Sequence, residues 1–270
     1  MKKILPRIYI GLMLLFFYLP IIYVVIFSFN ESKSLTNFTG FSMKWYDQMF
    51  NNRIMMESIY YTVLIAILAT IVSTIIGTIA AIGLSKSKKI VREVVIQINN
   101  LPMLNPEIVT AIGLMLLFVS FNIERGFTTL LLAHIAFCTP YVILSIMPKL
   151  RRLDPNIAEA ALDLGATPTQ ALYKVIIPQI IPGIMSGAII AFTMSFDDFI
   201  ISYFTTGPGI NTIATYVYTA IKRINPSVNA LSSIIVLVIT IVLLIVNITP
   251  ILAERRRKKK NEKIISDITI

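Results

Sequence analysis

The chain has 270 residues, of which 56% are hydrophobic and only 14% are charged. Soluble globular proteins carry about 25% charged residues. This composition, with a mean hydropathy of +0.79, therefore excludes an ordinary soluble domain and indicates a membrane protein. The net charge of +10 comes from short basic clusters between apolar runs, a pattern typical of membrane orientation and not of nucleic-acid binding. A single cysteine, Cys138, and a single histidine, His134, exclude a disulfide scaffold and a His/Cys metal site.

Long intervals without charge predict the membrane-spanning helices, because about 20 apolar residues are needed to cross about 30 Å of hydrocarbon. The interval after Arg7 is too long for a signal peptide and has no small-residue cleavage site, so we interpret it as a retained helix. Asn105, Pro106 and Glu107 are typical of a helix start, with an acid facing the positive end of the helix dipole. We predict an all-α integral membrane protein with six spans, over residues 8–29, 58–85, 105–122, 127–148, 182–204 and 231–252.

The distribution of basic residues predicts the orientation. With the N-terminus in the cytoplasm, most of the 24 Lys and Arg residues fall in the inner segments, so we expect both termini inside. The basic tail, residues 253–270, fixes orientation or binds anionic lipid. Nothing in the composition marks a second domain, and we predict one membrane domain over residues 1–270.

The inner segment over residues 149–178 is too polar for the bilayer but has the signals of ordered structure. Asp154 and Pro155 predict the start of a short helix, and Gly165 stands where a left-handed C-terminal cap is needed. Thr167 and Gln170 have the spacing of a capping box for a second helix. Two short helices around a glycine turn form a rigid elbow, which suits docking to a partner protein.

These residues carry a resemblance to a known family. Glu159-Ala160-Ala161, then Gly165, then Val175-Ile176-Ile177-Pro178 resembles the EAA loop of the MetI-like permeases of ABC importers. The resemblance implies a permease core over about residues 57–252, in which Glu159, Ala160, Ala161, Gly165 and Pro178 couple to a separate ATP-binding subunit. ATP and Mg²⁺ would bind that partner, since this chain has no phosphate-binding loop of the G-x-x-x-x-G-K-[ST] type. We expect no bound cofactor, no metal and no enzymatic activity in the chain itself.

Two adjacent carboxylates, Asp197 and Asp198, interrupt the predicted fifth span. Ionisable residues inside membrane segments are costly and indicate function by default. They stand among aromatic residues, Phe196, Phe199 and Tyr203, and acids beside aromatic rings suit an organic cation. We therefore predict that these five residues line a substrate pathway faced by one or both acids. An alternative is that the acids pair with Lys222, Arg223 or a partner permease and only hold a gate.

The run from Ser195 to Gly209 is similar to spermidine/putrescine permeases of the PotC type. That resemblance implies import of polyamines in a bacterial plasma membrane. The expected partners are two copies of the ATPase, a second, PotB-like permease, an extracytoplasmic polyamine-binding protein and membrane lipid.

Other functions stay open from the sequence. An ABC permease for iron, thiamine or an opine would share the elbow. An ion-coupled secondary transporter would use Asp197, Asp198 and Glu107 as coupling sites but would leave the elbow unexplained. A membrane scaffold would leave the paired acids unexplained. His134 and Cys138 share a helix face, where we expect a packed, hydrogen-bonded histidine and not a proton relay.

Overall fold

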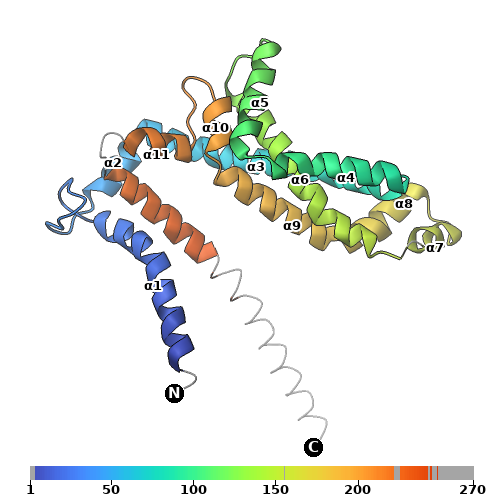
Figure 1. Ribbon diagram of the computed structural model, residues 1–270, viewed down its shortest axis with the longest axis horizontal. Helices are drawn as coiled ribbons and strands as arrows, with labels where there is room; N and C mark the ends of the chain where they lie inside the picture. The colour runs from blue at the N-terminus through green and yellow to red at the C-terminus, as the bar shows by residue number, and fades with distance from the viewer. Residues whose placement is uncertain (1–3, 155, 222–225, 243, 245–247, 249–270) are drawn as a thin grey trace, which may run out of the picture. The chain divides into compact units, whose positions relative to one another are not determined.

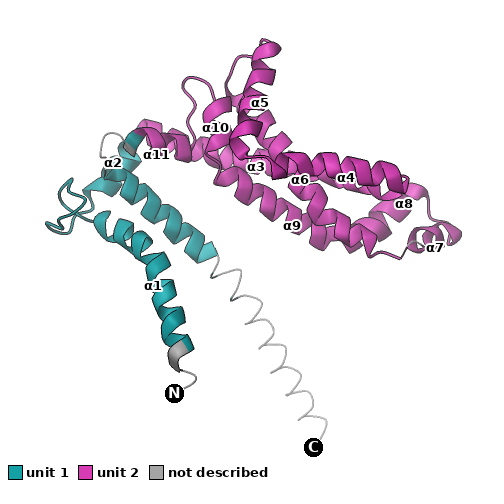
Figure 2. Ribbon diagram, in the orientation of Figure 1, with its two compact units in different colours: residues 1–52, 220–270 teal, residues 53–219 magenta. Residues whose placement is uncertain are grey.

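The computed structural model describes residues 4–154, 156–221, 226–242, 244 and 248. Within these ranges the secondary structure is helical, with one isolated bridge between Asn30 and Phe41 and no β-strand (Figure 1). The prediction of an all-α protein is confirmed. The chain divides into two compact units, residues 1–52 with 220–270 and residues 53–219 (Figure 2).

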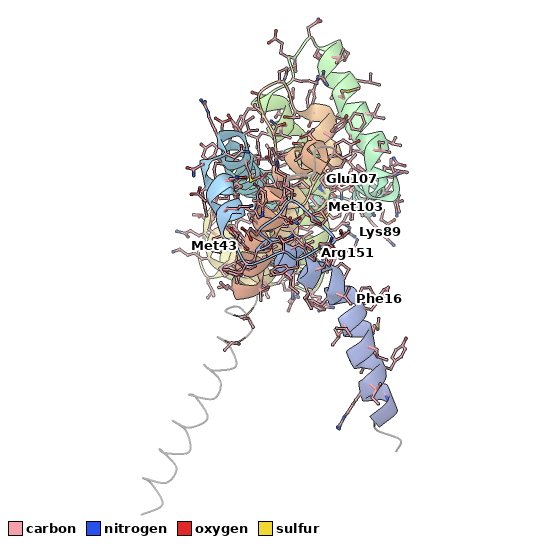
Figure 3. The ribbon with its side chains drawn as sticks, turned by 90° about the vertical axis from the view of Figure 1, so that its left-hand side faces the viewer. Phe16, Met43, Lys89, Met103, Glu107 and Arg151 are labelled. Atoms are coloured by element: carbon pink, nitrogen blue, oxygen red, sulfur yellow. The ribbon has the colours of Figure 1, made fainter. Side chains whose placement is uncertain are left out.

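The first unit contains α1 (Ile4–Phe27) and α2 (Lys44–Asn51). Apolar side chains cover α1 on all sides; Phe16, labelled in Figure 3, is 75% exposed. The loop between the two helices is built around Asn30, whose side-chain amide donates to the carbonyls of Ser34 and Asn37, each at 2.9 Å. Trp45 in α2 donates its indole N–H to the Asn30 carbonyl at 2.6 Å. These bonds give the loop one defined conformation.

Three long helices form the core of the second unit: α3 (Arg53–Lys86), α6 (Phe127–Arg151) and α9 (Ile177–Phe196), which run together in Figure 1. Val142 of α6 is fully buried between glycines of the other two helices. A Cβ added at Gly77 of α3 would lie 2.7 Å from the Val142 side chain, and one added at Gly187 of α9 would lie 3.2 Å from the Val142 Cα. Small residues at these positions let the helix backbones approach closely, as is common between membrane helices.

The predicted third span begins differently from our expectation. Asn105 ends α4 (Lys89–Leu104), Pro106 is the N-cap of α5 (Glu107–Ser120), and the two helices meet at a bend of 104°. Proline is disfavoured inside a continuing helix and restricts the residue before it, so Pro106 separates two helices instead of starting one after a loop. Helix α4 was not predicted, because its basic first turn is typical of a cytoplasmic loop.

The predicted fifth span also has different limits. One continuous helical segment runs from Pro168 to Phe196 through α8 (Pro168–Ala171), a π-helical turn, η1 (Leu172–Ile176), and α9. It ends before the two aspartates, and a separate short helix, α10 (Ile200–Thr205), follows. The expected span over residues 182–204 is therefore not one continuous helix: its helix begins before residue 182 and breaks after Phe196.

Within the described ranges, four helices are long and apolar enough to cross a membrane, over residues 6–27, 53–86, 127–151 and 168–196. The bent pair α4 and α5 makes a fifth if it crosses as one broken span. A shorter apolar helix covers Ser227–Val242, where the sixth span is predicted. Apart from residues 244 and 248, the rest of that span lies outside the described residues, as does the predicted basic tail, so six spans remain a prediction.

Candidate functional site

The glycine turn of the elbow, in the second unit, has the local geometry that its sequence predicts. Helix α7 (Ile157–Asp163) carries Glu159, Ala160 and Ala161, and ends in a glycine cap. Gly165 has a φ of +85°, the left-handed region that glycine adopts without strain. The N–H of Gly165 donates to the Leu162 carbonyl at 2.9 Å, and the N–H of Ala166 donates to the Ala161 carbonyl at 3.0 Å. This pair of bonds is a Schellman motif, which satisfies the last carbonyls of the helix.

The second helix of the elbow begins at the predicted capping box. The Thr167 N–H donates to the Gln170 side chain at 3.0 Å, and the Gln170 N–H donates to the Thr167 hydroxyl at 3.3 Å. A π-helical turn, in which the Ile177 N–H reaches back to the Leu172 carbonyl, directly precedes Pro178. The ring of a proline clashes with the carbonyl four residues before it. A wider, π-helical turn before Pro178 relieves this clash.

The start of the elbow differs from the prediction. The N-cap of α7 is Asn156 and not Asp154, whose carboxylate instead accepts the Asn156 N–H at 2.9 Å; Pro155 lies outside the described residues. Glu159 and Ala160 are exposed, and Leu164 at the tip is 89% exposed.

The two aspartates occupy the break between α9 and α10, and the structure gives them opposite environments. Asp197 is the exposed C-cap of α9. The Asp198 side chain is fully buried, and its two carboxylate oxygens accept the N–H groups of Ile201 at 3.1 Å and Ser202 at 2.7 Å. Asp198 therefore caps the first turn of α10.

A buried histidine completes the environment of Asp198. His134 of α6 is 1% exposed; its Nδ1 lies 2.7 Å from the Ser195 hydroxyl and its Nε2 lies 3.1 Å from the Ser202 hydroxyl. Nε2 is also 3.5 Å from the Asp198 carboxylate. The expectation of a packed, hydrogen-bonded histidine is confirmed. The network ties α6 to both sides of the break and holds the break in place.

Aromatic side chains form a cluster that begins two residues after the exposed aspartate. The rings of Phe199, Tyr203 and Tyr218 are in mutual contact, with centroids 5.0–5.7 Å apart. Tyr218 comes from α11 (Ile213–Ile221), whose first N–H donates to the Thr62 hydroxyl of α3 at 2.8 Å. Phe196 does not join this aromatic cluster and stacks on Phe192. Tyr218 was not predicted as a member of this cluster, since α11 lies beyond the glycine-rich turn.

A third acid, Glu107, belongs to the same region. It is half-buried at the start of α5, beside the α4–α5 bend (Figure 3), and is close enough to Asp198 and Asp197 to feel both charges. Within the described ranges, neither Glu107 nor Asp197 has a basic side chain at ion-pair distance. Lys222 and Arg223, the alternative partners, lie outside those ranges. No group of three His, Cys, Asp or Glu residues in the described ranges could hold a metal ion.

The turn after α10 packs tightly on the start of α6. Substitution of a glycine on each side of this contact tests the packing. A Cβ at Gly207 would overlap the Arg125 carbonyl, whereas a Cβ at the adjoining Gly126 would meet nothing within 4 Å. Gly126 also has an extended φ of 176°, open to any residue. We expect Gly207→Ala to destabilise the protein by about 1–3 kcal/mol, as overpacking does, and Gly126→Ala to leave stability unchanged. Thermal unfolding in detergent measures both, and equal apparent Tm values for the two variants would contradict this packing.

Comparison with known proteins places the chain in a family. Residues 73–258 match the family described as "Binding-protein-dependent transport system inner membrane component". The chain is 37% identical to the putrescine transport system permease protein PotI of Escherichia coli (strain K12), over 82% of this chain and 81% of that one. It is 34% identical to the spermidine/putrescine transport system permease protein PotC of the same strain, over 82% and 84%. The PotC homolog of Mycoplasma genitalium is 30% identical over 95% of both chains.

Solved structures support the same fold. A bacterial ABC transporter involved in the import of the acidic polysaccharide alginate matches 92% of this chain and 95% of its own, with a TM-score of 0.68 and 16% identity. This likeness concerns the fold alone. The family match decides against the scaffold and the ion-coupled transporter considered above. The chain belongs to the inner membrane components of binding-protein-dependent transport systems, the family of ABC importer permeases that its elbow motif predicts.

Proposed function

We propose that the chain is the permease subunit of an ATP-driven importer of polyamines such as spermidine and putrescine. The observation that carries this proposal is the exposed Asp197 beside the aromatic cluster of Phe199, Tyr203 and Tyr218, with Glu107 close by. A polyamine is a flexible chain of ammonium groups. Carboxylates attract each ammonium group, and aromatic faces add about 0.5–2 kcal/mol through cation–π contact. The names of the relatives, putrescine and spermidine/putrescine permeases, support the same substrate class.

The two aspartates have separate tasks in this proposal. Asp197 and Glu107 supply charge to the substrate pathway, which Phe199, Tyr203 and Tyr218 border. Asp198 has both oxygens committed to the backbone of α10, so it acts through the position of the break and not by contact with substrate. Phe196, at the last turn of α9, borders the same pathway one residue before Asp197.

The elbow joins the permease to a separate ATPase subunit. Glu159, Ala160, Ala161 and Leu164 form the docking face on α7, Gly165 fixes the turn, and Pro178 follows the π-helical turn that leads into α9. Because helix is continuous from Pro168 to Phe196, a displacement at the elbow is transmitted along α9 toward the break at Asp197. ATP and Mg²⁺ bind the partner, and this chain supplies no cofactor site.

The complete importer would contain this chain, a second PotB-like permease, two ATPase subunits and an extracytoplasmic polyamine-binding protein. This chain would cross the bacterial plasma membrane six times, with both termini in the cytoplasm. That orientation puts the elbow and the basic ends of α3 and α6 on the ATPase side. It also puts the break at Asp197 toward the binding protein, since α9 begins near the elbow and ends at the break.

Uptake of labelled spermidine by cells that depend on this permease tests the substrate class. We expect unlabelled spermidine and putrescine to compete, and ferric iron, thiamine and an opine not to compete. The control is a strain that lacks the gene, in which labelled uptake falls to background. Competition by one of the other solutes, with none by putrescine, would overturn the polyamine assignment and leave the family assignment intact.

A further inference from the structure

A pocket of about 400 Å³ lies beside the elbow, within the second unit. The ends of α3 and α6 form one side, and α7 and η1 form the other. Its walls are mostly apolar, with Ile82, Leu150, Ile157 and Ile176 among the lining residues. Pockets of about 300–1,000 Å³ are the size that small ligands occupy. No residue placed in the substrate pathway lines this pocket.

Two exposed cations line the same pocket. Lys86 ends α3, and Arg151, labelled in Figure 3, ends α6. In the described part of the chain neither has an acidic side chain within 4 Å. The acid of the lining, Asp154, has one oxygen engaged by the Asn156 N–H. A mostly apolar pocket lined by two available cations suits an amphiphilic anion.

We propose that this pocket binds the headgroup and upper acyl chain of an anionic phospholipid. Lys86 and Arg151 hold the phosphate, and the apolar walls contact the acyl chain. A lipid fits better than a soluble anion because both cations terminate membrane-spanning helices, so the pocket opens at the level where headgroups lie. The bound lipid would join the ends of α3 and α6 to α7. The proposal rests on the membrane location of the family and not on the polyamine substrate.

Photo-crosslinking with a phosphatidylglycerol analogue tests the proposal on the full chain in nanodiscs of phosphatidylcholine. The lining variant is Lys86→Ala with Arg151→Ala. The matched control is Lys88→Ala with Arg152→Ala, which removes the same charge from neighbouring residues that do not line the pocket. The crosslinking is done at high salt, which screens general attraction between exposed charges. The labelled peptides are then mapped by mass spectrometry. Equal apparent Tm values for the two double variants show that both are folded.

We expect the label on residues 82–86 and 150–158 of the unaltered chain. Labelling should fall about tenfold or more in the lining variant, the loss expected for charge-assisted hydrogen bonds, and stay within about twofold in the control. An equal fall in both variants, or no label on these peptides, would overturn the proposal. Loss of labelling when inorganic phosphate is present during irradiation would also overturn it, by showing a site for a soluble anion. Polyamine uptake does not enter this readout, so failure here leaves the proposed function standing.

Discussion

Glu159→Lys is expected to lower ATP-driven uptake about tenfold or more while the protein still inserts in the membrane at its normal level. Glu159 is exposed on α7 and makes no described ion pair, so its replacement leaves the fold of this chain unchanged. On a docking face, charge reversal at a central residue costs about 2 kcal/mol or more. Leu164→Asp should act in the same way, because its 89% exposed side chain contributes to docking and not to the core. Uptake, ATP hydrolysis and co-purification of the ATPase measure the effect.

Glu93→Lys is the matched control for charge reversal. Glu93 is an exposed acid on α4, and its ion pair with Lys89, at 4.0 Å, is exposed and contributes little to stability. Uptake by this variant should stay near that of the unaltered permease. If Glu159→Lys and Leu164→Asp both kept normal uptake and normal ATPase binding, the elbow would not be the docking element.

Substitutions at the two aspartates should have different effects, one on transport and the other on stability. Asp197→Asn is expected to lower spermidine uptake about tenfold with no change in apparent Tm, because the side chain is exposed and the substitution conserves its shape. A charge pair at about 4 Å is worth about 4 kcal/mol at an effective dielectric constant near 20, and a third of that is about tenfold in rate or affinity. Asp198→Ala should instead lower the free energy of unfolding by about 2 kcal/mol or more, since two buried N–H groups and His134 lose a partner.

Measurement of uptake and thermal unfolding on the same preparations makes the comparison. Asp198→Asn keeps one carbonyl oxygen as an acceptor and should fall between Asp198→Ala and the unaltered chain in apparent Tm. The reverse result, a destabilised Asp197→Asn and a stable Asp198→Asn with low uptake, would contradict the division of tasks between the two residues.

The elbow could be predicted from the sequence because its determinants are local. The left-handed backbone at residue 165 requires only a glycine at that position. The capping box requires only Thr167 and Gln170, which stand three residues apart. The break at Asp197 could not be predicted in the same way. The residues around it are apolar and read as one continuous helix, and the partner that stabilises the break, His134, is far away in the sequence.

The aromatic cluster shows the same limit. Phe199 and Tyr203 were predicted because they are neighbours of the acids on the chain, whereas Tyr218 reaches them only after α11 is fixed to Thr62 of α3. Helix α4 was missed because Lys88, Lys89 and Arg92 mark a membrane boundary. In the structure these residues lie at the start of a helix that runs on to Leu104.

The most direct test of the account is ATP-driven spermidine uptake by proteoliposomes that contain the complex purified through a tag on this chain. We predict that the ATPase and a second permease co-purify, and that uptake requires ATP on the elbow side and the polyamine-loaded binding protein on the other. In this system Glu159→Lys and Asp197→Asn should each lower uptake. Spermidine uptake driven by an ion gradient without ATP, or no uptake with every partner present, would contradict the account.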